Sequence, residues 1–66
     1  MSVDKIISEW ESIQTLIEAT DLDVRKNANG NSSAGLRARK SFRTLRSRLA
    51  ELTRATIAAD KARKDS

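Results

Sequence analysis

The sequence predicts an all-α fold, an antiparallel helical hairpin that dimerises into a four-helix bundle. Apolar residues recur every three or four positions in both halves of the 66-residue chain, which is the spacing of one helix face. A single cluster of turn-forming residues separates the halves, and the chain contains no proline to interrupt them. We therefore interpret residues 1–66 as one helical-hairpin domain, because a short connection makes consecutive helices antiparallel neighbours.

The first predicted helix covers about residues 3–26. Asp4 lies near its start, and Arg25 and Lys26 lie near its end, where they match the positive and negative poles of a helix dipole. Its apolar stripe has the alternating three-four spacing of an amphipathic helix rather than the period of two of a strand. The residues expected in the core on this helix are Ile6, Trp10, Ile13 and Ile17.

The break between the helices lies at about residues 27–33, which read Asn-Ala-Asn-Gly-Asn-Ser-Ser. Gly30 tolerates the positive φ that a helix C-cap or tight turn requires. Asn31, Ser32 or Ser33 can cap the next helix through a side-chain oxygen. An Asn-Gly pair also favours a β-hairpin turn, but the flanking residues show no alternation, so we reject that interpretation.

The second predicted helix covers about residues 34–60, and a polar, frayed tail is expected at 61–66. Its stripe begins with the small residues Gly35 and Ala38, which favour a close approach of the helices beside the short loop. Bulky core residues follow at Phe42, Leu45, Leu49 and Leu52. One hairpin of this size buries only a thin seam, so we expect a homodimer; a longer coiled coil and a tetramer stay open as alternatives.

Charge is distributed unevenly along the chain. Residues 1–33 carry three Lys or Arg and six Asp or Glu, a net charge of −3, whereas residues 34–66 carry ten against three, a net charge of +7. This excess predicts a polyanionic partner, because arginine and lysine side chains neutralise phosphates and release counterions. The alternative is a solvated face paired with acids of the first helix, but those acids are too few to neutralise it. The residues predicted to bind DNA are Arg25, Lys26, Arg37, Arg39, Lys40, Arg43, Arg46 and Arg54.

The composition argues against catalysis. The chain contains no histidine and no cysteine, which removes the usual general base and the usual zinc ligands. We expect no enzyme activity, no metal, no cofactor and no small-molecule substrate. No apolar run approaches the roughly 20 residues of a bilayer span, and the N-terminus lacks the basic region of a secretory signal. We therefore expect a cytoplasmic protein with no membrane partner.

Residues 30–40 read Gly-Asn-Ser-Ser-Ala-Gly-Leu-Arg-Ala-Arg-Lys, and Leu45-Arg46 follows within the same helical pattern. This segment resembles the core of the bacterial histone H1-like nucleoprotein family, which includes a chlamydial nucleoid-condensing type and short, tail-less relatives. The resemblance implies a helical hairpin that binds and compacts DNA without sequence preference, with the family's basic motif at Arg37, Arg39 and Lys40. The long lysine- and alanine-rich tail of the chlamydial type is missing, which leaves the helical stripe as the main expected contact.

The leading hypothesis is a dimeric, nucleoid-associated, histone-like protein that grips the phosphate backbone of duplex DNA and bridges or compacts it. One rival hypothesis is a small helical regulatory protein that docks on an acidic protein partner. Another is an RNA binder. A pull-down from nuclease-treated lysate separates the first two hypotheses, and a comparison of duplex RNA with duplex DNA tests the third.

Overall fold

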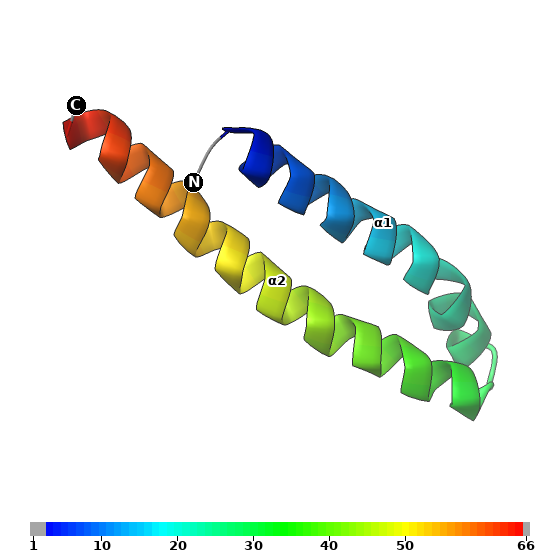
Figure 1. The fold of residues 1–66 in the computed structure, drawn as a ribbon. Coiled ribbons are helices and arrows are strands. Elements are labelled where there is room, and N and C mark those ends of the chain that lie inside the picture. Colours follow the sequence, from blue (N-terminus) through cyan, green and yellow to red (C-terminus); the bar gives the residue numbers. More distant parts are fainter. Residues whose placement is uncertain (1–2, 66) are drawn as a thin grey trace.

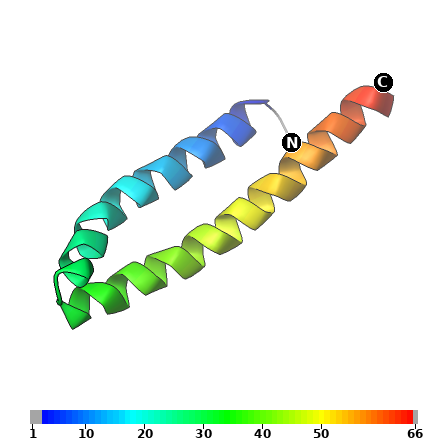
Figure 2. The ribbon, with the colours of Figure 1, turned by 180° about the vertical axis from the view of Figure 1, so that it is seen from behind.

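The protein folds as two antiparallel helices joined by a tight turn (Figure 1). This computed structural model describes residues 3–65. Helix α1 spans Val3–Ala28 and helix α2 spans Ser32–Asp65, with no strand among those residues. The helices lie side by side, and the C-terminal end of α2 extends past the start of α1 (Figure 2). The molecule measures 53 × 16 × 12 Å along its principal axes, and the predicted helical hairpin is confirmed.

The turn between the helices is closed by caps on both sides. Gly30 has a φ of 103°, which a residue with a Cβ adopts only with strain. Its N–H donates to the carbonyl of Asn27 at 2.9 Å, and the N–H of Asn31 donates to the carbonyl of Lys26 at 3.0 Å, a Schellman arrangement. The Asn31 side-chain oxygen then accepts the Ala34 N–H at 2.9 Å and caps α2. Both predicted capping roles are confirmed.

Both helices are longer than the sequence pattern predicts. The largest difference lies at residues 61–66, where a frayed tail was expected but α2 continues to Asp65; residue 66 lies outside the described residues. Residues 36–65 contain no glycine or proline and are rich in alanine, arginine and lysine, which are strong helix formers. An ion pair between Asp60 and Arg63 also bridges one turn. Polarity alone was therefore a wrong indicator of fraying.

The seam between the helices is narrow and is lined with small side chains near the turn. Ala34 and Ala38 are 0% and 2% exposed, and Ile13 of α1 is fully buried farther from the turn. Thr20 is also buried, and its hydroxyl donates to the Leu16 carbonyl at 2.7 Å, so no unpaired polar atom is left in the seam. The expected close approach beside the loop is thus present.

Inside the hairpin, only half of the predicted core residues are covered. The covered ones are Ile6, Ile13, Leu45 and Leu52, which are buried or half-buried. The other four are Trp10, Ile17, Phe42 and Leu49, which are 44%, 49%, 47% and 42% exposed respectively. These four residues are not covered within one hairpin, and their burial in a seam shared with a second copy stays a prediction.

The reason lies in the geometry of a three-four stripe. Such a stripe contains two sets of positions that each repeat every seven residues, and the two sets point about 50° apart around the helix axis. A single neighbouring helix covers one of these two sets, together with the residues on the side of that set that lies away from the other set. In α1 the covered set contains Ile6 and Ile13, while the set with Trp10 and Ile17 faces solvent.

As a result, the hairpin exposes more surface than a compact monomer. Its accessible surface is 5168 Å². A compact monomer of its mass of 7.3 kDa exposes about 4,200 Å². The excess of about 1,000 Å² arises because the molecule is elongated and because the second set of apolar positions is not covered by another helix.

Candidate nucleic-acid interface

Helix α2 carries a row of cations on its outer side. We call this row the basic ridge; it consists of Arg39, Lys40, Arg43, Arg46 and Arg54. All five residues are exposed, and within residues 3–64 no hydrogen bond or ion pair involves their side chains. Helical periodicity places them within an arc of about 120° and along about 22 Å of the helix. Ser47 and Ala50 lie between the cations, so no bulky side chain covers the ridge.

Arg37, which the sequence predicts to bind DNA, lies apart from the basic ridge. Its guanidinium reaches across the seam edge to Asp23 of α1, with Nη2 donating to Oδ1 at 3.0 Å and Nε donating to Oδ1 at 3.2 Å. The side chain of Asp23 is only 24% exposed, against 57% for that of Arg37. A forked, charge-assisted contact of this kind holds the guanidinium in place and neutralises it. Arg37 is therefore a structural cation in the hairpin.

The two predicted cations of α1 are not brought to the ridge. Arg25 forms an ion pair with Asp21 one turn earlier, with Nε and Oδ2 2.9 Å apart. The hydrogen bond from Arg25 to Asp21 raises the pKa of Arg25 above its usual value, with the charge of Asp21 as the second cause. Periodicity places Arg25 on the side of α1 that faces away from α2, which is the opposite edge of the hairpin from the basic ridge. Lys26 is exposed beside the turn.

One cation that the predicted set omitted has a defined contact. Arg48 donates from Nη1 to the Ser12 hydroxyl at 2.7 Å, which links the two helices near the middle of their length. Its position on the seam flank is visible in the sequence, but the identity of its partner is not, because Ser12 is 36 residues away. Lys61 adds a further exposed cation on the last turns of α2, beyond the predicted end of that helix.

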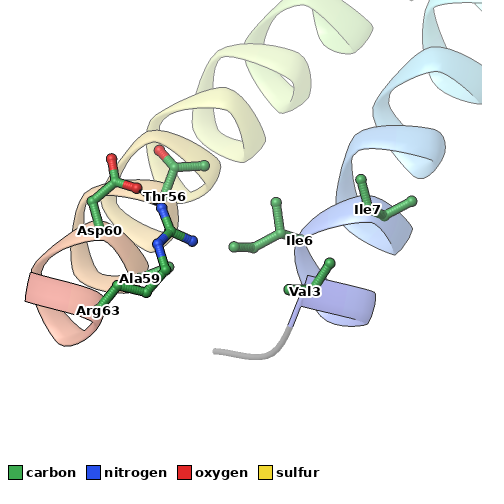
Figure 3. Close-up of a pocket in the computed structure, with 7 residues that line it drawn as sticks. All are labelled: Val3, Ile6, Ile7, Thr56, Ala59, Asp60 and Arg63. Carbon is green, nitrogen blue, oxygen red and sulfur yellow. Dashed lines mark hydrogen bonds and ion pairs between the residues drawn. The ribbon is translucent and has the colours of Figure 1, made fainter. Parts of the chain in front are cut away.

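The rest of the described surface contains an open pocket but no cluster of metal-binding side chains. Among them, no group of three or more His, Cys, Asp and Glu side chains could hold a metal ion. An open pocket of about 210 Å³ lies between the first turns of α1 and the end of α2, where Ile6 and Arg63 point into the gap (Figure 3). Its other lining residues are mainly apolar, and its only carboxylate belongs to Asp60. No helix in the described residues is long and apolar enough to cross a lipid bilayer.

Comparison with known proteins gives one match. A family model described as histone H1-like protein Hc1 matches residues 7–63, which include most of α1, the whole turn and nearly all of α2. No match was found among curated proteins or among solved structures. The matched region contains every residue of the basic ridge.

Proposed function

We propose a function from the premise that this chain belongs to the family of the histone H1-like protein Hc1. This is a family of DNA-binding structural proteins of the nucleoid and not a family of enzymes. The proposal is that the chain binds the phosphate backbone of duplex DNA through the basic ridge, without reading base sequence, at the nucleoid in the cytoplasm.

The observation that carries this proposal is the lack of internal partners for the ridge. Five cations stand in solvent over about 22 Å of helix, whereas Arg25 and Arg37 are neutralised by aspartates. Duplex DNA carries one charge per about 1.7 Å of its axis, so a row of this length always meets several phosphates. If all five cations contact phosphates, the affinity falls with salt with a logarithmic slope of about −4.5 per protomer.

The chemistry of the ridge supports binding without sequence preference. Bases are read by side chains such as Asn, Gln or a buttressed Arg held against a groove edge. The ridge combines exposed Arg and Lys side chains with the small residues Ser47 and Ala50, and no acid within residues 3–64 pairs with any of its five cations. Contacts of this type position a protein on DNA but carry no sequence information.

A gel-shift series tests the proposal. Two duplexes of equal length and unrelated sequence are titrated with the protein at about 50 to 200 mM salt. We expect equal affinities for the two duplexes within about threefold and a steep loss of affinity with salt. Salt-insensitive binding, or no binding at the lowest salt, contradicts the proposal. A duplex RNA of the same length and an acidic protein serve as competitors and show whether DNA is the preferred polyanion.

We also propose that the protein acts as a homodimer, which presents two basic ridges and so bridges or compacts duplexes. A bead-bound duplex that captures a second, labelled duplex only when the protein is present tests the bridging. Capture is expected to pass through a maximum as protein increases, because excess protein coats each duplex separately. Binding without capture at any protein concentration contradicts bridging while leaving DNA binding intact.

A further inference from the structure

The uncovered heptad positions of the two helices lie on one side of the hairpin. Contacts across the opposite edge identify the polar side, where Arg37 meets Asp23 and Arg48 meets Ser12. On α1, Trp10, Ile17 and Val24 lie at the other edge of the seam. Because the helices are antiparallel, the corresponding edge of α2 contains Phe42 and Leu49. We call these five residues the apolar face: Trp10, Ile17, Val24, Phe42 and Leu49.

The apolar face is continuous and only partly covered. Each of its five residues is between 41% and 49% exposed. Each side chain is therefore partly covered by α1 and α2, and the rest of its surface is in contact with solvent. At the end of the hairpin away from the turn, the face continues into the pocket lined by Val3 and Ile6 (Figure 3). Two aromatic and three aliphatic side chains in one strip are typical of an interface rather than of a solvated surface.

A second copy of this chain fits the face best. The hairpin exposes about 1,000 Å² more than a compact monomer of its mass, which is close to the roughly 800 Å² that each partner buries in a stable interface. A second hairpin also supplies the same two-helix width and the same seven-residue spacing, as four-helix bundles require. The inference rests on the homodimer proposed above and not on the binding of DNA.

Two symmetric arrangements bring two such faces together. If the turns lie at opposite ends, α1 packs on α1 and α2 on α2. If the turns lie at the same end, α1 of each copy packs on α2 of the other. Residues 1–33 carry a net charge of −3 and residues 34–66 a net charge of +7. With the turns at opposite ends, helices of like net charge therefore pack on each other. With the turns at the same end, helices of opposite net charge pack on each other.

The axial register sharpens this contrast. The contacts Asp23 to Arg37 and Ser12 to Arg48, together with the close approach of Asn27 to Gly35, show that facing residues of α1 and α2 have numbers that add to 60–62. A two-fold axis parallel to the helices preserves this register between copies. It then places Arg39 beside the second copy's Asp21, at the rim of the apolar face. With the turns at opposite ends, the cationic row of α2 would instead lie beside the same row of the second copy.

We propose that two copies pack through their apolar faces with both turns at the same end, and that Arg39 pairs with Asp21 of the other copy at the rim. This arrangement gives the cations of the basic ridge two roles. Arg39 and Arg46 border the dimer interface, while Lys40, Arg43 and Arg54 face outward and remain available to phosphates.

Distances between spin labels test the arrangement without DNA. The chain contains no cysteine, so Asn29→Cys in the turn provides a unique label on the full-length protein. With both turns at one end, the two labels lie within about 30 Å of each other; with turns at opposite ends, they are more than about 40 Å apart. Ser47→Cys, near the middle of α2, is the matched control, because both arrangements bring its labels close. A long distance at position 29 overturns the arrangement, and no dipolar coupling at either position overturns the dimer.

Two sets of variants test the contacts by solution mass. Leu49→Lys is expected to weaken dimerisation at least about tenfold, because it places a charge in the apolar face. Leu36→Lys makes the same change at a residue that is 66% exposed and lies off the face, and it should have no effect. Arg25→Ala removes the internal partner of Asp21. In that background, Arg39→Asp should weaken the dimer, and Asp21→Arg in the same chain should restore it. Equal effects of the two leucine variants, or no restoration, contradict the proposed contacts. If the unmodified protein dimerises but does not bind DNA, only the proposed function is contradicted.

Discussion

At the scale of single residues, one glycine makes room for a side chain of the other helix. A Cβ on Gly35 would lie 2.3 Å from Nδ2 and 2.8 Å from Cγ of Asn27, so a side chain there displaces the amide. The same amide donates to the Asn31 carbonyl at 3.2 Å, which links the end of α1 to the cap of α2. The sequence indicates a small residue at this position but does not reveal which group it accommodates.

Gly35→Ala is therefore expected to destabilise the protein by about 1 kcal/mol, because the Asn27 amide must move away and lose its hydrogen bond to the Asn31 carbonyl. In an Asn27→Ala background the same change should be stabilising by about 0.5–1 kcal/mol, since alanine is a better helix former than glycine. Urea unfolding followed by circular dichroism, at one fixed protein concentration, measures both differences. A stabilising effect in the native background would show that the two groups do not collide.

The ion pair between Arg37 and Asp23 neutralises one cation that would otherwise add to the proposed DNA-binding surface. Asp23→Asn should release Arg37 and raise the affinity for duplex DNA about two- to fivefold, with a salt slope steeper by about 0.9. The loss of folding stability should stay below about 1 kcal/mol, because the pair is more than half exposed on the arginine side. Asp4→Asn makes the same change in charge at an exposed residue far from the turn. Equal gains in the two variants would mean that net charge alone sets the affinity.

At the scale of the helices, α2 separates its cations by function. Those on the seam edge, such as Arg37 and Arg48, hold the two helices together, while those of the basic ridge stand free on the outer side. Spacing along the sequence gives the angles between the side chains of one helix, which are about 100° apart for successive residues. It does not give the angle at which the helix as a whole faces its neighbour. The contacts with α1 fix that angle.

Replacing outward cations singly should reveal which of them meet phosphate. Lys40→Ala, Arg43→Ala and Arg54→Ala are each expected to reduce the magnitude of the salt slope by about 0.9 and to weaken binding for all sequences alike. Arg25→Ala should leave the slope nearly unchanged, because that guanidinium is already paired with Asp21 on the opposite edge. The measurement is a fluorescence-anisotropy titration at four salt concentrations. A slope that responds to Arg25 but not to Arg43 would place the DNA on α1.

At the scale of the whole molecule, one hairpin has little interior. Only Ile13, Ala34 and Ala38 among its described hydrophobic residues are buried, and two of these are alanines. Short chains without disulfides or metals depend on association for stability. The same feature that leaves the monomer weak, an open strip of large side chains, provides the surface for a partner.

The thermal midpoint should therefore depend on protein concentration. For a dimer that unfolds to two separate chains, a hundredfold increase in concentration is expected to raise Tm by about 10 °C. Leu49→Lys should have a lower Tm that does not change with concentration, and Leu36→Lys should behave like the unmodified protein. Circular dichroism melts at about 2 and 200 µM in cells of different path length make the comparison. A constant Tm for the unmodified protein would mean that the hairpin is stable alone.

The sequence by itself determined the elements and the chemistry of this protein. Helical periodicity and the Asn-Gly turn predicted the hairpin, the caps at Gly30 and Asn31 were correctly placed, and the Arg-x-Arg-Lys segment led to the correct family. Each of these depends on residues close together in the chain. The C-terminal extent of α2 was missed because polarity was weighed above helix propensity.

Only the tertiary structure decided which side of each helix is covered and which cations are neutralised. Trp10 and Ile13 both belong to the predicted stripe, but one is exposed and the other buried, because a single neighbouring helix spans only part of it. Arg37 and Arg43 are equally basic in sequence, yet Arg37 is paired with an aspartate 14 residues away and Arg43 is not. Both outcomes depend on the rotation of one helix against another, a long-range quantity that no local spacing contains.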